Sequence, residues 1–233
     1  MTVSIIPLEG IREARPGDDV VELLTGGLEV SRVTLQEGDV MVVTHKLVSK
    51  AEGRIVELGA DPEAHRDLII REASAILRRR DALVITETPH GFVCANAGVD
   101  RSNVAPGRAV LLPVDPDRSA RRIRARLLNA FGITVGVVIT DTFGRAWRHG
   151  LTDIAIGVAG IPAIVDHRGT LDTFGNTLEV TEVAIADEIA AAADLVMGKA
   201  RGIPAAVVRG LELPVHDGSA SDLVRHPSDD LFR

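Results

Sequence analysis

Residues 135–150 read VGVVITDTFGRAWRHG. The first five are apolar and mostly β-branched, which predicts a strand buried on both faces in the middle of a sheet. We expect this strand to stop at Thr140, and we expect Gly144 to let the backbone turn sharply. The stretch therefore predicts an α/β protein whose central strand delivers polar groups to one edge of a sheet.

The polar half of this stretch combines oxygen ligands with positive charge. Asp141 and Thr142 supply a carboxylate and a hydroxyl, and Arg145, Arg148 and His149 follow closely. Mg²⁺ and Mn²⁺ prefer such oxygens, and the arginine fork grips phosphate. The pattern fits a divalent metal beside a phosphate. It fits equally an ordinary strand end, in which Asp141 caps a turn and the arginines are solvated.

Composition narrows the classes of partner. The 233 residues carry a net charge of −7, with 45% hydrophobic and 3% aromatic residues. A negative chain with few aromatics argues against binding nucleic acid or an anionic membrane. Its one cysteine rules out a disulfide within the chain. No signal peptide or membrane span is recognisable, so we expect a cytoplasmic protein.

Two further strand ends repeat the pattern. An apolar run at residues 40–43 leads into residues 44–54, where Lys46 and Lys50 share one face if this segment is helical. They would suit a polyphosphate, although a solvated helix start explains them as well. A strand at residues 92–95 leads into a polar loop with Asp100, a second candidate metal carboxylate that also fits an ordinary turn.

The remaining pattern is that of one domain, residues 1–211, with a polar tail at 212–233. We expect a helix from residue 20 that ends at Gly26 and Gly27. A second helix is predicted at 63–80, with the arginines at 78–80 as its solvated end. Further helices are predicted at 116–130 and 182–196, and a last strand at 205–210. There is no Walker A or Rossmann glycine fingerprint.

Several ordered motifs resemble the coenzyme F420 gamma-glutamyl ligase family. They are residues 47–54 (LVSKAEGR), 96–104 (NAGVDRSNV), 138–145 (VITDTFGR), 182–190 (EVAIADEIA) and 207–210 (VVRG). The resemblance extends from about residue 3 to residue 211. It implies an α/β (α+β) fold of mixed sheets with flanking helices in two subdomains, and a homodimer.

The resemblance also implies an activity and its site. The family adds L-glutamate to the deazaflavin precursor of coenzyme F420 (F420-0 or its dehydro form) with GTP, Mg²⁺ or Mn²⁺, two ions and potassium activation. Positions that match the family's metal ligands are Asp100 and Asp141 for one ion and Thr142 for a second. Those that match its nucleotide contacts are Ile11, Arg12, Glu13, Ala14, His45, Lys50 and Asn103.

Two positions depart from the family pattern. His45 stands where serine is found in relatives, and Lys199 stands where archaeal members have an acidic loop. A lysine cannot ligate a metal, so the second ion site is expected to be incomplete or filled by substrate phosphates. The lysine form resembles actinobacterial two-domain members, and the tail looks like the junction to their flavin-binding half.

These residues suggest a mechanism with named roles. A carboxylate activated as an acyl phosphate could be attacked by the glutamate amine, with Asp141, Lys50 and Arg145 as the catalytic set. His149 could act as the base, although a lone histidine is more often a packed or surface residue. Two other classes stay open: a metal-dependent phosphotransferase or phosphatase, and a non-catalytic GTP-binding dimerisation module.

Overall fold

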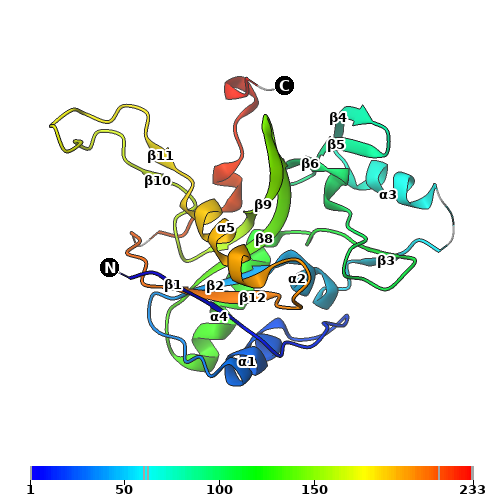
Figure 1. Cartoon of the computed structure of the whole chain (residues 1–233), viewed down its shortest axis with the longest axis horizontal. Coiled ribbons are helices and arrows are strands. Elements are labelled where there is room, and N and C mark those ends of the chain that lie inside the picture. The colour runs from blue at the N-terminus through cyan, green and yellow to red at the C-terminus, as the bar shows by residue number, and fades with distance from the viewer. Residues whose placement is uncertain (1, 60, 62, 215, 232–233) are drawn as a thin grey trace.

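The computed structural model describes residues 2–59, 61, 63–214 and 216–231. Its centre is a five-stranded sheet in the order β1-β12-β2-β8-β9 (Figure 1). β2 and β8 run parallel, and the other neighbours are antiparallel. The strands are β1 (Ser4–Pro7), β12 (Ala205–Arg209), β2 (Val40–Thr44), β8 (Gly136–Arg145) and β9 (Arg148–Ala159).

Helices cover both faces of this sheet. α4 (Pro116–Phe131) packs on β8 and β9 from one side, beside α1 (Val20–Ser31), and α5 (Ile185–Met197) packs on β9, β12 and β1 from the other (Figure 1). Val40, Val137 and Ile139 are completely buried between these layers. The apolar run that opens β8 therefore forms a strand buried on both faces, as predicted.

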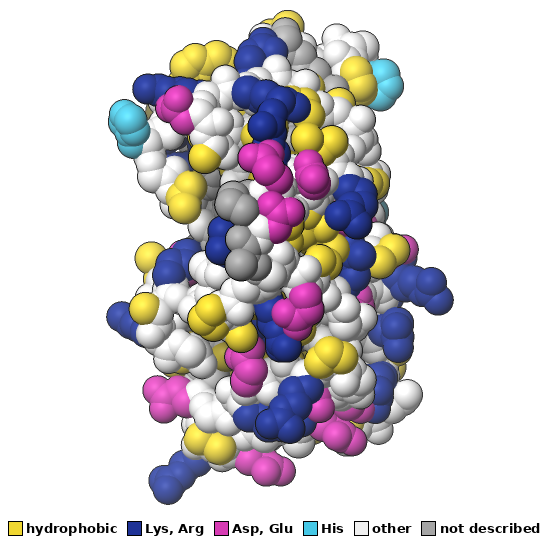
Figure 2. All heavy atoms as spheres, turned by 90° about the vertical axis from the view of Figure 1, so that its right-hand side faces the viewer, with side chains coloured by type: hydrophobic (Ala, Val, Ile, Leu, Met, Phe, Trp, Pro, Cys, Tyr) yellow, Lys and Arg dark blue, Asp and Glu magenta, His cyan; other side chains and the backbone are white. Residues whose placement is uncertain are grey.

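A second, smaller core lies beside the first. It is formed around Leu68, Ile69, Val84 and Leu111. These residues come from α3 (Ala64–Glu72), from the sheet of β4 (Ala75–Arg80), β5 (Leu83–Glu87) and β6 (Val93–Ala95), and from the end of the β3 (Ile55–Glu57) and β7 (Arg108–Val110) pair. The predicted mixed α/β fold with two subdomains is confirmed. Figure 2 views the side of the molecule on which this smaller subdomain lies. Acidic and basic side chains are mixed over that surface.

The central strand is longer than predicted. β8 does not stop at Thr140, and Gly144 is not the turn. Instead β8 pairs with β9 as far as Arg145, and the hairpin turns at Ala146 and Trp147, where Trp147 adopts φ 57°. Pairing with β9 satisfies the backbone of the polar residues, so the strand continues after its apolar pattern has ended.

Three other element boundaries were predicted wrongly. α1 continues through Gly26 and Gly27 to Ser31. Gly27 is required there by packing and not by a turn, since a Cβ atom would lie 2.6 Å from Ile11 Cγ1. The predicted helix at 63–80 ends at Glu72, and the arginines at 78–80 lie in β4, paired with β5. This strand pairing overrides the helical pattern.

The third wrong boundary is the start of the helix predicted at 182–196. Glu182 and Val183 form β11, which pairs with β10 (Val165–Asp166), and α5 begins only at Ile185. By contrast, α4 lies where it was predicted, and residues 45–51 do form a helix, α2 (His45–Ala51), which carries both Lys46 and Lys50.

The segment after residue 211 packs against the body of the protein. Two short 3₁₀ turns interrupt it, at Ala220–Leu223 and Pro227–Asp229. Ala220 is buried, and Ser219 donates a hydrogen bond to Asp117 at the start of α4. Residues 215, 232 and 233 of the predicted tail lie outside the described residues. Across the part of the chain that is described, we find no helix with the length and apolar character that a bilayer crossing requires.

Gly157 offers a test of the packing between β9 and α4. A Cβ atom at this position would lie 2.6 Å from the carbonyl oxygen of Pro116, which is backbone and cannot swing away. We expect Gly157→Ala to lower the free energy of unfolding by about 1–3 kcal/mol, as overpacked cores do. Urea denaturation measures the loss.

Gly144→Ala is the matched control for this substitution. It lies on the partner strand of the same hairpin, and its Cβ atom would meet only Leu151, at an ordinary 3.9 Å. We expect a change of less than about 0.5 kcal/mol. Equal losses in the two variants would show that the contact with Pro116 is not what makes Gly157 necessary.

Candidate functional site

A cavity of about 550 Å³ opens where the parallel pairing of β2 with β8 ends and α2 begins. Ligands of α/β sheets commonly bind outside the carboxyl ends of parallel strands, and this volume is within the range of small-molecule sites. It is lined by the segment before α1, the end of β2 with α2, the loop after Asp100, the middle of β8, β9 at Asp153, and the end of α5 with the loop that follows it. The charged and histidine side chains in its lining are Arg12, Glu13, His45, Lys46, Lys50, Asp141, Asp153, Asp194 and Lys199.

The parallel pairing of β2 and β8 places His45 beside Asp141. Thr44 lies opposite Thr140 in the register, so the residues that follow are neighbours. His45 is buried, and its Nε2 lies 3.2 Å from Asp141 Oδ1 without hydrogen-bond alignment. The same oxygen accepts a hydrogen bond from the Thr142 backbone N–H at 2.7 Å. Asp141 therefore presents a carboxylate at the cavity wall, faced by a buried imidazole nitrogen.

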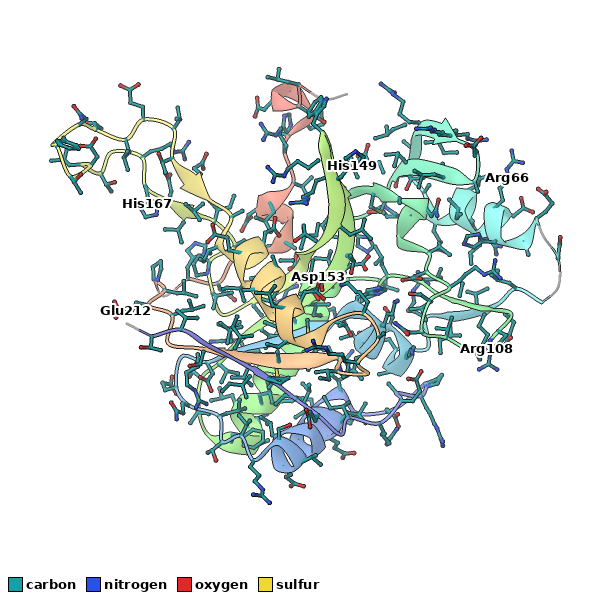
Figure 3. All side chains as sticks on the ribbon, viewed as in Figure 1. Arg66, Arg108, His149, Asp153, His167 and Glu212 are labelled. Carbon is teal, nitrogen blue, oxygen red and sulfur yellow. The ribbon has the colours of Figure 1, made fainter. Side chains whose placement is uncertain are left out.

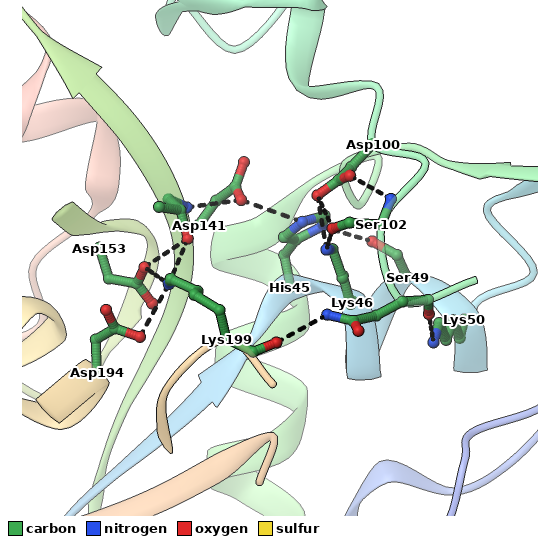
Figure 4. Close-up of polar contacts among 12 residues, drawn as sticks. His45, Lys46, Ser49, Lys50, Asp100, Ser102, Asp141, Asp153, Asp194 and Lys199 are labelled. Carbon is green, nitrogen blue, oxygen red and sulfur yellow. Dashed lines mark hydrogen bonds and ion pairs between the residues drawn. The ribbon is translucent and has the colours of Figure 1, made fainter. Parts of the chain in front are cut away.

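Lys46 lines the cavity and forms an ion pair with Asp100. Its Nζ lies 2.6 Å from Asp100 Oδ2, and the backbone N–H and hydroxyl of Ser102 also donate to this carboxylate (Figure 4). Burial raises the pKa of Asp100, but the hydrogen bonds from Lys46 and Ser102 outweigh it and hold the pKa below its ordinary value. Asp100 is therefore ionised at neutral pH.

Asp100 and Asp141 alone do not make a closed metal cage. Among the described residues, no three or more His, Cys, Asp or Glu side chains gather as a metal-binding group. Mg²⁺ is usually held by one or two carboxylates, with water and substrate phosphates completing its shell. Asp141 lines the cavity, whereas Asp100 lies just outside the lining and is paired with Lys46.

Lys50 draws three predicted nucleotide segments together. It is 5% exposed, and its Nζ donates to Glu13 Oε1 and, at 2.7 Å, to the backbone carbonyl of Asn103. Residues 11–14, α2 and the loop at Asn103 are far apart in the sequence. They meet at one ammonium group on the cavity wall.

Lys199 occupies the opposite wall. Its Nζ donates to Thr142 Oγ1 at 2.7 Å, to Asp153 Oδ1 at 2.6 Å and to Asp194 Oδ1 at 2.8 Å (Figure 4). Burial lowers the pKa of Lys199, but the hydrogen bonds to Asp153 and Asp194 bring it above its ordinary value. The hydroxyl that was predicted to hold a second ion is thus already bound to an ammonium group.

Comparison with known proteins identifies the family. The family described as F420-0:Gamma-glutamyl ligase matches residues 10–210. This chain belongs to that family. A relative from Methanopyrus kandleri named "Coenzyme F420:L-glutamate ligase" is 44% identical over 100% of this chain and 98% of its own. Relatives with the same name from Methanothermobacter thermautotrophicus and Archaeoglobus fulgidus are 42% and 40% identical, each over 100% of this chain and 100% and 97% of their own.

In this member of the ligase family, Arg145 does not reach the cavity. Arg145, Arg148 and His149 lie near the exposed tip of the β8–β9 hairpin, where Arg145 donates to the His149 carbonyl. Figure 3 shows His149 well along the hairpin from Asp153, which lies beside α5. Each residue extends a strand by about 3.3 Å, so the extra length of β8 carries Arg145 away from Asp141.

Sequence reasoning missed Asp153 and Asp194 and treated Lys199 only as a departure from the family. A usable signal was present, because the chain has only three lysines among its 26 basic residues. All three, Lys46, Lys50 and Lys199, line this cavity. Each of the three lysine ammonium groups contacts at least two oxygen atoms. All other basic side chains of the chain, apart from histidine, are arginines.

Cys94 lies close to the site and is expected to be unreactive. It is 6% exposed, and burial together with the charge of Asp141 raises the pKa of its thiol to about 12. A raised pKa means less thiolate at pH 8, so we expect alkylation by iodoacetamide to be slower than in the unfolded chain by on the order of 10³-fold. Mass spectrometry of the native and urea-unfolded protein measures both rates. Similar rates would contradict the burial of this thiol.

Proposed function

We propose that this chain is a GTP-dependent ligase that joins L-glutamate to the carboxylate end of the F420 precursor, F420-0 or its dehydro form. The observation that carries the proposal is the pairing of charges around the cavity. Lys46 pairs with Asp100, Lys50 with Glu13, and Lys199 with Asp153 and Asp194. Asp141 is faced by His45 instead, so its charge is the one best placed to attract a metal–nucleotide complex.

The chemistry follows from the weakness of a carboxylate as an acyl donor. Transfer of the γ-phosphoryl group of GTP to a carboxylate oxygen of the precursor gives an acyl phosphate and GDP. The glutamate amine then attacks the carbonyl carbon, loses a proton, forms the amide and expels inorganic phosphate. Phosphoryl transfer depends mainly on positioning and on neutralising charge, and Lys46 and Lys50 are placed to do both.

A divalent cation belongs to this proposal. Asp100 and Asp141 would hold Mg²⁺ or Mn²⁺, which supplies charge neutralisation at the phosphate oxygens. His45 is buried, and its Nε2 faces Asp141 Oδ1 at 3.2 Å. Potassium activation, the homodimer and a cytoplasmic location stay predictions.

The test is phosphate release from GTP with Mn²⁺ or Mg²⁺, with and without the deazaflavin precursor and L-glutamate. Release that needs both co-substrates, together with one glutamate mass added to the deazaflavin, would establish the ligase. Release without them would identify a phosphotransferase or phosphatase instead. GTP binding with no release under any combination would identify a non-catalytic module.

A further inference from the structure

The Lys199 ammonium group lies in a cage of three oxygen atoms from three different elements. Thr142 lies on β8, Asp153 on β9 and Asp194 on α5, and their oxygens lie 2.6–2.8 Å from Nζ (Figure 4). Two carboxylates and a hydroxyl are hard oxygen donors, the set that divalent cations bind. The cage therefore has the composition of a cation site with a lysine side chain inside it.

The buried carboxylate of Asp153 needs a positive charge beside it, and this is why the cage must hold a cation. The residue is 2% exposed, and its carboxylate also accepts hydrogen bonds from Thr140 Oγ1 at 3.1 Å and from Thr142 Oγ1 at 2.6 Å. Two hydroxyl donors do not neutralise a buried charge, and an unpaired buried charge is strongly destabilising. Lys199 provides the compensating charge, with its Nζ 2.6 Å from Asp153 Oδ1 and 2.8 Å from Asp194 Oδ1.

The loop that carries Lys199 favours this role. It leaves α5 at Gly198, which adopts φ 61°, and this turn brings residue 199 back toward the end of the helix. Arg201 is in the same loop, yet its guanidinium group lies beside the Val196 carbonyl and outside the cage. An ammonium group is compact and presents its donors from one centre, as a metal ion does, whereas a guanidinium group is a flat fork.

We propose that Lys199 is a tethered cation that takes the place of a bound metal ion at Thr142, Asp153 and Asp194, so that this chain holds one divalent ion fewer than its oxygen ligands could support. The inference deepens the proposed function, since Thr142 was the expected ligand of a second ion.

The test counts Mn²⁺ ions bound per chain, from the free-ion signal in electron paramagnetic resonance, in protein without GTP or other substrates. We expect Lys199→Ala to bind one more Mn²⁺ ion per chain than the wild type. Adding Asp194→Asn to that variant should remove the extra ion. Arg201→Ala is the matched control, since it deletes a cation from the same loop without touching the cage, and its count should equal that of the wild type.

Thermal unfolding provides a second measurement. Without metal, Lys199→Ala should unfold at a lower temperature than the wild type, and Mn²⁺ should raise its unfolding temperature by more than that of the wild type. If Lys199→Ala does not fold, Lys199→Ser serves in both measurements.

Equal Mn²⁺ counts in the wild type and the lysine variant would overturn the inference. The count needs no turnover, so a failed ligase assay leaves it standing. Equal counts, in turn, leave the ligase assay unaffected.

Discussion

Asp141→Asn is expected to lower glutamate-dependent phosphate release from GTP by about 10²–10³-fold or more, the loss that follows removal of a pre-organised electrostatic group. Asparagine keeps the shape of the side chain and can still accept the hydrogen bond from the Thr142 backbone N–H. What it loses is the negative charge beside His45. The loss should appear at saturating GTP, because the charge is needed in the reacting complex, and circular dichroism should show an unchanged fold.

Asp166→Asn is the control for this prediction. Its carboxylate is exposed on β10 and forms an ion pair with Arg168, which also pairs with Glu182. It is outside the cavity lining, so turnover should be unchanged although the same charge is removed. Wild-type turnover in Asp141→Asn would refute the role given to Asp141 and, with it, the metal position between Asp100 and Asp141.

The cavity residues that could be named from the sequence are those that follow a short apolar run. The change from apolar to polar residues drew attention to Asp141 and Lys50, which lie where the apolar part of β8 ends and in the helix that follows β2. Each of these predictions depends on a few adjacent residues, which is why the sequence was sufficient.

The parts that were predicted wrongly depend on distant partners. Arg145 was placed at the site because the strand was expected to end, but the length of β8 is decided by pairing with β9. The arginines at 78–80 lie in a strand because β5 pairs with them. The cage at Lys199 joins residues 57 and 46 positions apart, and no local pattern encodes such a contact.

Lys50→Met is expected to weaken GTP binding by about 10- to 100-fold, because a charged hydrogen bond to phosphate contributes about 1.5–3 kcal/mol. Methionine has a similar length and fills the buried channel of the 5%-exposed lysine stem without leaving a large cavity. Glu13, the partner of Lys50, is 72% exposed at its side chain, so its carboxylate becomes solvated and the fold is kept. Isothermal titration calorimetry with GTP and Mg²⁺ measures the change.

A second variant distinguishes the effect of the Lys50 charge on GTP affinity from an effect of its packing. Glu13→Gln removes the carboxylate that competes with phosphate for the Lys50 ammonium group, so it should leave GTP affinity unchanged or increase it. Arg66→Met deletes an exposed cation on α3, far from the cavity (Figure 3), and should change affinity less than about twofold at moderate salt. If Lys50→Met and Arg66→Met bound GTP equally well, Lys50 would be a structural lysine that ties residues 11–14 to α2, and the nucleotide phosphates would have to lie nearer Lys46.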